Sequence, residues 1–73
     1  MIVEIFLVVD PEPEFPEEAV RGRCPLFSLE ASGYDEVPVR EFLKGAALTA
    51  LSNYETVPDT IEFRVSSKVK MPT

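Results

Sequence analysis

The chain has 73 residues, enough for one domain, with a net charge of −6 and no histidine. Its single cysteine, Cys24, rules out an intramolecular disulfide, and one cysteine without histidine cannot build a zinc site. We therefore expect a single domain over residues 1–73 that holds no metal or cofactor. For so short a chain, self-association is the remaining way to bury more surface.

The charge is unevenly distributed along the chain. Residues 1–36 contain nine acids and two arginines, a net charge of −7, whereas residues 37–73 contain four acids and five bases, a net charge of +1. A domain with this balance repels polyanions at long range. We therefore do not expect a nucleic-acid partner, unless the C-terminal bases form a local stripe.

The first predicted element is a strand over residues 2–9, which are rich in β-branched residues and apolar on both faces. A strand of this kind is typically central in its sheet or covered on both faces. The run is far shorter than the ~20 residues of a membrane span, and it lacks the basic segment and cleavage site of a signal peptide. We expect a core strand of a cytoplasmic protein with no membrane contact.

Residues 10–18 read Asp-Pro-Glu-Pro-Glu-Phe-Pro-Glu-Glu and predict an exposed, semi-stiff acidic loop. Prolines remove backbone donors and favour extended neighbours, and repulsion between the acids acts in the same direction. Phe15 either packs back on the core or serves as a contact residue. The pattern Asp10, Glu12, Glu14 superficially resembles a calcium loop, but the positions that need glycine and an acid hold Phe15 and Arg21.

The next segment predicts a strand that begins at about residue 19 and ends at Gly33. Gly22 and Pro25 indicate a bulge or an edge in its first part. Residues 26–32 alternate apolar and polar residues and predict a half-buried strand.

A helix is predicted from about Pro38 to about Asn53, with proline in its first turn and acids ahead of it. Gly45 is expected to allow a close approach of this helix to the sheet. The predicted apolar face consists of Val39, Phe42, Leu43, Ala46, Ala47, Ala50, Leu51 and Tyr54.

Residues 60–71 alternate again and predict the last strand. Its expected inner face carries Ile61, Phe63, Val65, Val69 and Met71, and its outer face carries three bases and one acid. The fold class is therefore α+β: a small, mainly antiparallel sheet of three or four strands in β-β-α-β order, with one helix packed on one face. A right-handed crossover gives the spatial order 2-1-3, with residues 2–9 in the middle.

The short run Gly33-Tyr34-Asp35-Glu36-Val37-Pro38 stands between a strand and an amphipathic helix. Strand, turn and helix together are loosely similar to the small antitoxins of the HicB type, over about a third of the chain. This run departs from the polar Thr/Glu-rich run of that family, so no family and no function are assigned from the resemblance.

No catalytic constellation is expected. Without histidine the serines lack the usual base, and Cys24 is expected to be a small buried or edge residue. The three glycines are isolated, so no phosphate-binding loop is expected. Adjacent acids such as Glu17 and Glu18 lie in predicted loops without the burial that perturbs a carboxyl for acid–base work.

Two functional hypotheses of different classes follow. The first is a non-enzymatic protein-binding module, an inhibitor or regulator that contacts a basic surface of another protein. A phage-encoded protein and a mimic of nucleic acid are two special cases of this hypothesis. Its candidate contact residues are Glu12, Glu14, Phe15, Glu17, Glu18, Asp35 and Glu36. The second is a homodimer that pairs through an edge strand and presents Arg64, Lys68 and Lys70 to an anion or nucleic acid.

Overall fold

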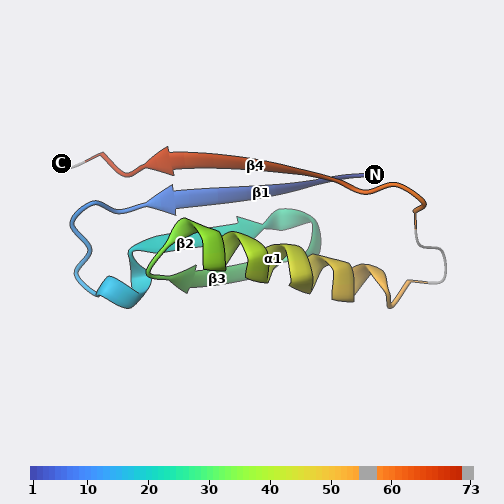
Figure 1. Cartoon of the computed structure of the whole chain (residues 1–73), viewed down its shortest axis with the longest axis horizontal. Helices are drawn as coiled ribbons and strands as arrows, with labels where there is room; N and C mark the ends of the chain where they lie inside the picture. The colour runs from blue at the N-terminus through green and yellow to red at the C-terminus, as the bar shows by residue number, and fades with distance from the viewer. Residues whose placement is uncertain (55–57, 72–73) are drawn as a thin grey trace.

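The computed structural model describes residues 1–54 and 58–71. Four strands form one sheet, and one α-helix packs on one of its faces (Figure 1). The elements are β1 (Ile2–Val9), η1 (Pro16–Glu18), β2 (Val20–Cys24), η2 (Pro25–Phe27), β3 (Leu29–Gly33), α1 (Glu36–Leu51) and β4 (Glu62–Val69), where η denotes a 3₁₀ turn.

The strand order is β3-β2-β1-β4. β1 pairs with β2 and β2 with β3 in antiparallel fashion, whereas β1 and β4 are parallel. The α+β class, the central β1 and its place beside the last strand are confirmed. The three-strand order 2-1-3 is wrong in detail, because the sheet has four strands. Two of its three strand pairings are antiparallel and one is parallel, so the sheet is mixed.

The fourth strand arises because residues 19–33 form two strands instead of one. Pro25 opens η2, which ends β2, and the chain reverses at Ser28, whose φ of 55° is left-handed. The Ser28 amide donates to the Pro25 carbonyl at 3.1 Å and closes the turn. Proline cannot donate to a ladder, so the strand must break there.

Helix α1 begins two residues before the predicted start and ends two residues earlier than predicted. Pro38 lies within its first turn, where a proline removes no intrahelical hydrogen bond. The residues buried on its sheet face recur every four positions: Val39, Leu43, Ala47 and Leu51. Phe42 and Tyr54, assigned to that face from the sequence, are exposed.

The close approach of helix to sheet occurs at Gly22, not at Gly45 as predicted. A Cβ added at Gly22 would lie 2.6 Å from a Leu43 methyl and 2.8 Å from methyls of Leu7 and Val39. A Cβ at Gly45 would meet nothing within 4 Å. Glycine is therefore needed on the β2 side of the contact, where α1 rests directly on the strand.

The hydrophobic core lies between α1 and the strands β1 and β2. Its buried members are Val3, Ile5, Leu7, Val20, Cys24, Val39, Leu43 and Ala47. Figure 1 shows α1 in front of β2 and β3. β4 runs along the side of β1 that faces away from β2. Within the described ranges, no helix is long and apolar enough to span a membrane.

This position of α1 leaves most of β4 uncovered, although the sequence predicted that one face of this strand is buried. Ile61 and Phe63 are half-buried, but Val65, Val69 and Met71 are exposed. The register with β1 places Val65 beside Ile5 and Val69 beside Val9 on the helix side of the sheet. These side chains do face the helix layer, but they lie beyond its edge.

Candidate functional site

The acidic loop 10–18 has a defined conformation and is closed at its base. The Asp10 amide donates to the Ala19 carbonyl at 2.7 Å, which joins the two ends of the loop. The Asp10 Oδ1 atom accepts a hydrogen bond from the Glu12 amide at 3.0 Å. At the far side, the Glu18 amide donates to the Phe15 carbonyl at 2.9 Å, which forms η1. Hydrogen bonds and proline together hold the loop in one shape.

Phe15 is an exposed residue rather than a core residue, because 51% of its surface is exposed. It stands at the start of η1 and helps to line a shallow hollow. The other lining groups are of mixed character and include Val8, Asp10, Pro13, Glu14 and Lys70. The alternative in which Phe15 packs on the core is therefore wrong.

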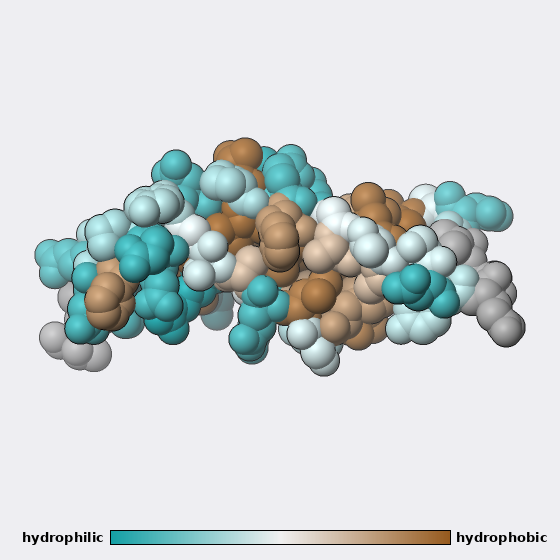
Figure 2. Space-filling model, turned by 90° about the horizontal axis from the view of Figure 1, so that it is seen from below, coloured by the Kyte–Doolittle hydropathy of each residue, from teal (hydrophilic) through white to brown (hydrophobic). Residues whose placement is uncertain are grey.

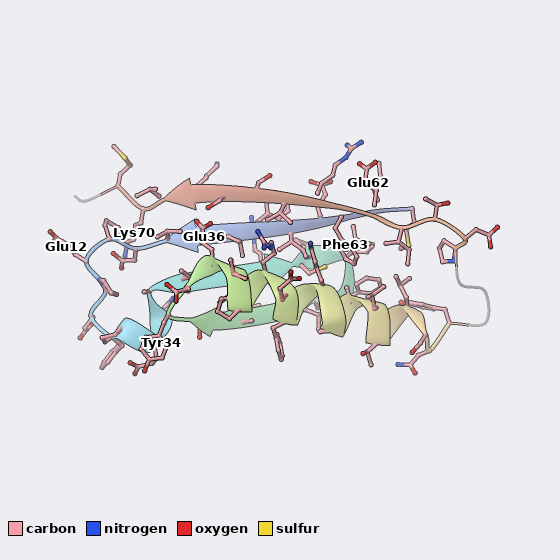
Figure 3. All side chains as sticks on the ribbon, viewed as in Figure 1. Glu12, Tyr34, Glu36, Glu62, Phe63 and Lys70 are labelled. Atoms are coloured by element: carbon pink, nitrogen blue, oxygen red, sulfur yellow. The ribbon has the colours of Figure 1, made fainter. Side chains whose placement is uncertain are left out.

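The start of α1 lies at the same end of the molecule as the loop. Figure 3 shows Glu12 and Glu36 toward this end, with Tyr34 at the turn that leads into the helix. Asp35 is the N-cap residue, although its side chain makes no cap hydrogen bond. Glu36 Oε1 accepts a hydrogen bond from the Ser67 hydroxyl at 2.7 Å, which links α1 to β4.

The fold thus brings all the predicted acidic contact residues to one end of the domain. We call this set the acidic end. Its members are Glu12, Glu14, Phe15, Glu17, Glu18, Asp35 and Glu36. Figure 2 shows hydrophilic side chains gathered at the left, the end at which the loop and the start of α1 lie in Figure 1.

Two cations partly neutralise this region. Arg21 pairs with Glu18 at 3.1 Å, and Lys70 pairs with Asp10 at 3.7 Å. Among the described residues, the remaining acidic-end carboxylates, those of Glu12, Glu14, Glu17, Asp35 and Glu36, make no ion pair. A surplus of carboxylates remains available to a cationic partner.

The predicted basic strand face is less uniform than its sequence suggests. Arg64, Lys68 and Lys70 lie on the face of the sheet opposite α1, but Arg64 Nε donates to Glu62 Oε2 at 2.6 Å and Lys70 pairs with Asp10. The structure adds Arg21 and Arg23 of β2 to this same face. Sequence pattern did not place these two arginines on a face, because Gly22 and Pro25 interrupt the segment in which they stand.

The same sheet face carries an apolar stripe along β1. Ile2 and Val8 are exposed, and Phe6 is half-buried beneath the guanidinium of Arg23, whose Cζ lies 5.1 Å from the ring centroid. The apolar character of both faces of residues 2–9 had indicated a central strand or one covered on both faces. β1 is central, but its second face is open to solvent.

A further apolar surface lies between β3 and α1. A shallow hollow there is lined by Ala31, Tyr34, Pro38 and Phe42, and the two aromatic rings are well exposed. In Figure 2, which views this side, apolar side chains run along the middle of the molecule. The sequence missed this surface because helical spacing alone placed Phe42 on the buried face.

The groups considered for chemistry are dispersed. Cys24 is fully buried in the core, as expected from its position. Ser52 donates to a helical carbonyl and Ser67 donates to Glu36. Over residues 1–54 and 58–71, no three His, Cys, Asp or Glu side chains are placed to hold one metal ion.

No family model, curated protein or solved structure matches the chain.

Proposed function

We propose that this protein is a non-enzymatic protein-binding module, an inhibitor or regulator that contacts a basic surface of another protein through its acidic end. The observation that carries the proposal is the convergence of an ordered acidic loop, residues 10–18, and the start of α1 at one end of the domain.

The shape of the loop supports this proposal. Binding costs less conformational entropy when the contact residues are already held in place. The backbone hydrogen bonds between Asp10 and Ala19 and between Phe15 and Glu18 supply that order. An exposed aromatic residue within a charged rim is the arrangement typical of an interface hot spot, and Phe15 occupies that place.

The charge supports a basic partner. Exposed carboxylates accelerate encounter with a cationic surface and disfavour acidic ones. A narrower form of the proposal is that the partner is itself a nucleic-acid-binding protein, with the carboxylates taking the place of phosphates. Competition between this protein and DNA or RNA for the captured partner distinguishes the narrower form.

The test is affinity capture with two charge-matched variants. The triple variant Glu12→Gln, Glu14→Gln, Glu17→Gln removes three acidic-end carboxylates that make no described ion pair. The control triple variant Glu4→Gln, Glu30→Gln, Asp59→Asn removes the same charge from exposed acids elsewhere. Three exposed contacts of about 0.2–1 kcal/mol each predict that the first variant binds the partner about threefold to a hundredfold more weakly.

The control variant is expected to retain its partner, and Phe15→Ala is expected to lose affinity by about fivefold or more if Phe15 is a hot spot. If the first variant captures the same partners as the wild type, the acidic end is not the binding surface. Equal losses with both triple variants would show that net charge alone is responsible.

A second candidate function rests on the basic residues of the open sheet face. Arg21 and Arg23 of β2 and Arg64 and Lys68 of β4 lie on this face, on either side of β1. Four bases on one face favour anion binding there. The same two triple variants discriminate between the candidates. A salt-dependent affinity for DNA or RNA that rises with the control variant, which removes the acids Glu4 and Glu30 from this face, would favour the second candidate.

A further inference from the structure

The outer edge of β4 is long and regular. β4 is the terminal strand of the order β3-β2-β1-β4, and its eight residues pair with β1 in an unbroken register from Glu62 to Val69. An edge strand of this length presents a row of backbone donors and acceptors to which another strand can be added.

The hydrogen bonds to β1 determine which backbone groups face outward. The amides of Glu62 and Lys70 donate to the carbonyls of Met1 and Val9 at 2.8 and 2.7 Å. Because successive residues of a strand direct their backbone groups to opposite sides, the even-numbered residues of β4 face β1. The backbone groups of Phe63, Val65, Ser67 and Val69 therefore point to the outer edge.

The side chains of these outward residues are largely apolar and poorly covered. Phe63 is half-buried, whereas Val65 is 38% and Val69 62% exposed. All three lie on the helix side of the sheet, where Lys44 of α1 reaches over the Phe63 ring and Val65 and Val69 stay exposed. The ribbon of α1 lies over β2 and β3, not over β4 (Figure 1). Pairing of this edge would remove apolar as well as backbone groups from water.

We propose that the β4 edge binds a second copy of this chain, with the two β4 strands antiparallel and a two-fold axis at Val65. Charge complementarity between the two strands selects this register. Val65 lies opposite Val65 of the partner subunit in a hydrogen-bonded pair, and Glu62 lies opposite Lys68 of the partner subunit. The Glu62 and Lys68 pair occurs twice, at non-hydrogen-bonded positions where facing side chains are closest.

Most of the neighbouring registers place like charges opposite each other. An axis at Arg64 places two copies of that arginine opposite each other, and an axis at Ser66 places Arg64 opposite the partner's Lys68. An axis at Ser67 places Arg64 opposite the partner's Lys70, again two like charges. An axis at Phe63 avoids repulsion but pairs only the first few residues of the strand. Like charges directly opposite each other destabilise a ladder, so the Val65 register is favoured.

The resulting dimer has a continuous sheet with both helices on one face, because the two-fold axis is perpendicular to the sheet. The apolar Phe63 and Val65 of the two copies then lie together between the helices. A strand ladder alone buries less surface than a permanent interface, so the association is expected to be reversible and concentration-dependent. This proposal goes beyond the protein-binding function, since its partner is another copy and its contacts are made by the β4 backbone and by Glu62, Val65 and Lys68, not by the acidic-end carboxylates.

Sedimentation of the purified protein over a concentration series tests the proposal by charge exchange. Glu62→Lys and Lys68→Glu each replace two attractive cross-strand pairs with repulsive ones, so each is expected to weaken dimerisation about tenfold or more. The double variant Glu62→Lys, Lys68→Glu restores opposite charges in the Val65 register and is expected to restore the dimer. Glu30→Lys, a matched change on the opposite edge strand β3, is expected to leave dimerisation unchanged.

A backbone variant gives a second readout. Val65→Pro removes an amide that points outward and makes no bond to β1, so the variant is expected to keep its fold by circular dichroism and to remain monomeric. A wild-type chain that stays monomeric at millimolar concentration would overturn the proposal, as would a folded double variant that fails to dimerise. Because no second protein is present, this outcome is independent of the capture experiment.

Discussion

β1 and β4 run side by side in parallel, and each places apolar residues on the helix side of the sheet, but they differ in burial. On the helix side, Val3 and Ile5 of β1 are fully buried, whereas Val65 and Val69 of β4 are 38% and 62% exposed. The difference arises because α1 packs over β3, β2 and β1 and leaves β4 outside its cover. A strand's alternation thus decides which residues share a face, while the position of the helix decides which face is core.

The largest effect that tests this comparison is expected at Leu43. Leu43→Ala removes a fully buried side chain of α1 and should cost about 2–5 kcal/mol, measured by urea denaturation at low protein concentration. The neighbouring Phe42→Ala, a larger truncation at a position that is 61% exposed, should cost less than about 1 kcal/mol. Equal costs would contradict the proposed helix orientation.

A smaller effect is expected at the contact between α1 and β2. Gly22→Ala adds a methyl to β2 within 2.8 Å of side chains from α1 and β1, so the helix or a strand must shift. Overpacking of this kind should destabilise the fold by about 1–3 kcal/mol. Gly45→Ala is the matched control, because its Cβ enters open space within a helix and should stabilise by up to about 1 kcal/mol. The opposite ranking of the two variants would mean that α1 approaches the sheet elsewhere.

The smallest effect on monomer stability is expected on β4. Val65→Ala truncates a partly exposed side chain, so the free energy of unfolding at low concentration should fall by less than about 1 kcal/mol. Ile5→Ala, at the position paired with Val65 on β1, should cost about 2–5 kcal/mol. Similar costs at the two positions would show that β4 is covered as well as β1.

Several features followed from the sequence because they depend on local chemistry. The β-branched, apolar run of residues 2–9 and the alternation of residues 60–71 predicted two strands. Helical spacing predicted α1, and the prolines and acids of residues 10–18 predicted an exposed loop. The candidate acidic contacts were found as residue types, but their convergence at one end was not predictable. It depends on the return of β3 beside η1 and on the place where α1 begins.

The amino-acid sequence by itself determined the α+β class, the central apolar strand β1 and the residues that share each face of β1, β3 and β4. The tertiary structure alone decided the break of residues 19–33 into two strands, the close contact at Gly22 and the exposure of Phe42 and Val65. The physical reason is that periodicity is a property of one segment, whereas burial depends on where a single short helix lies across four strands. That position is set by packing between distant segments, with Gly22 of β2 admitting Leu43 and Val39 of α1.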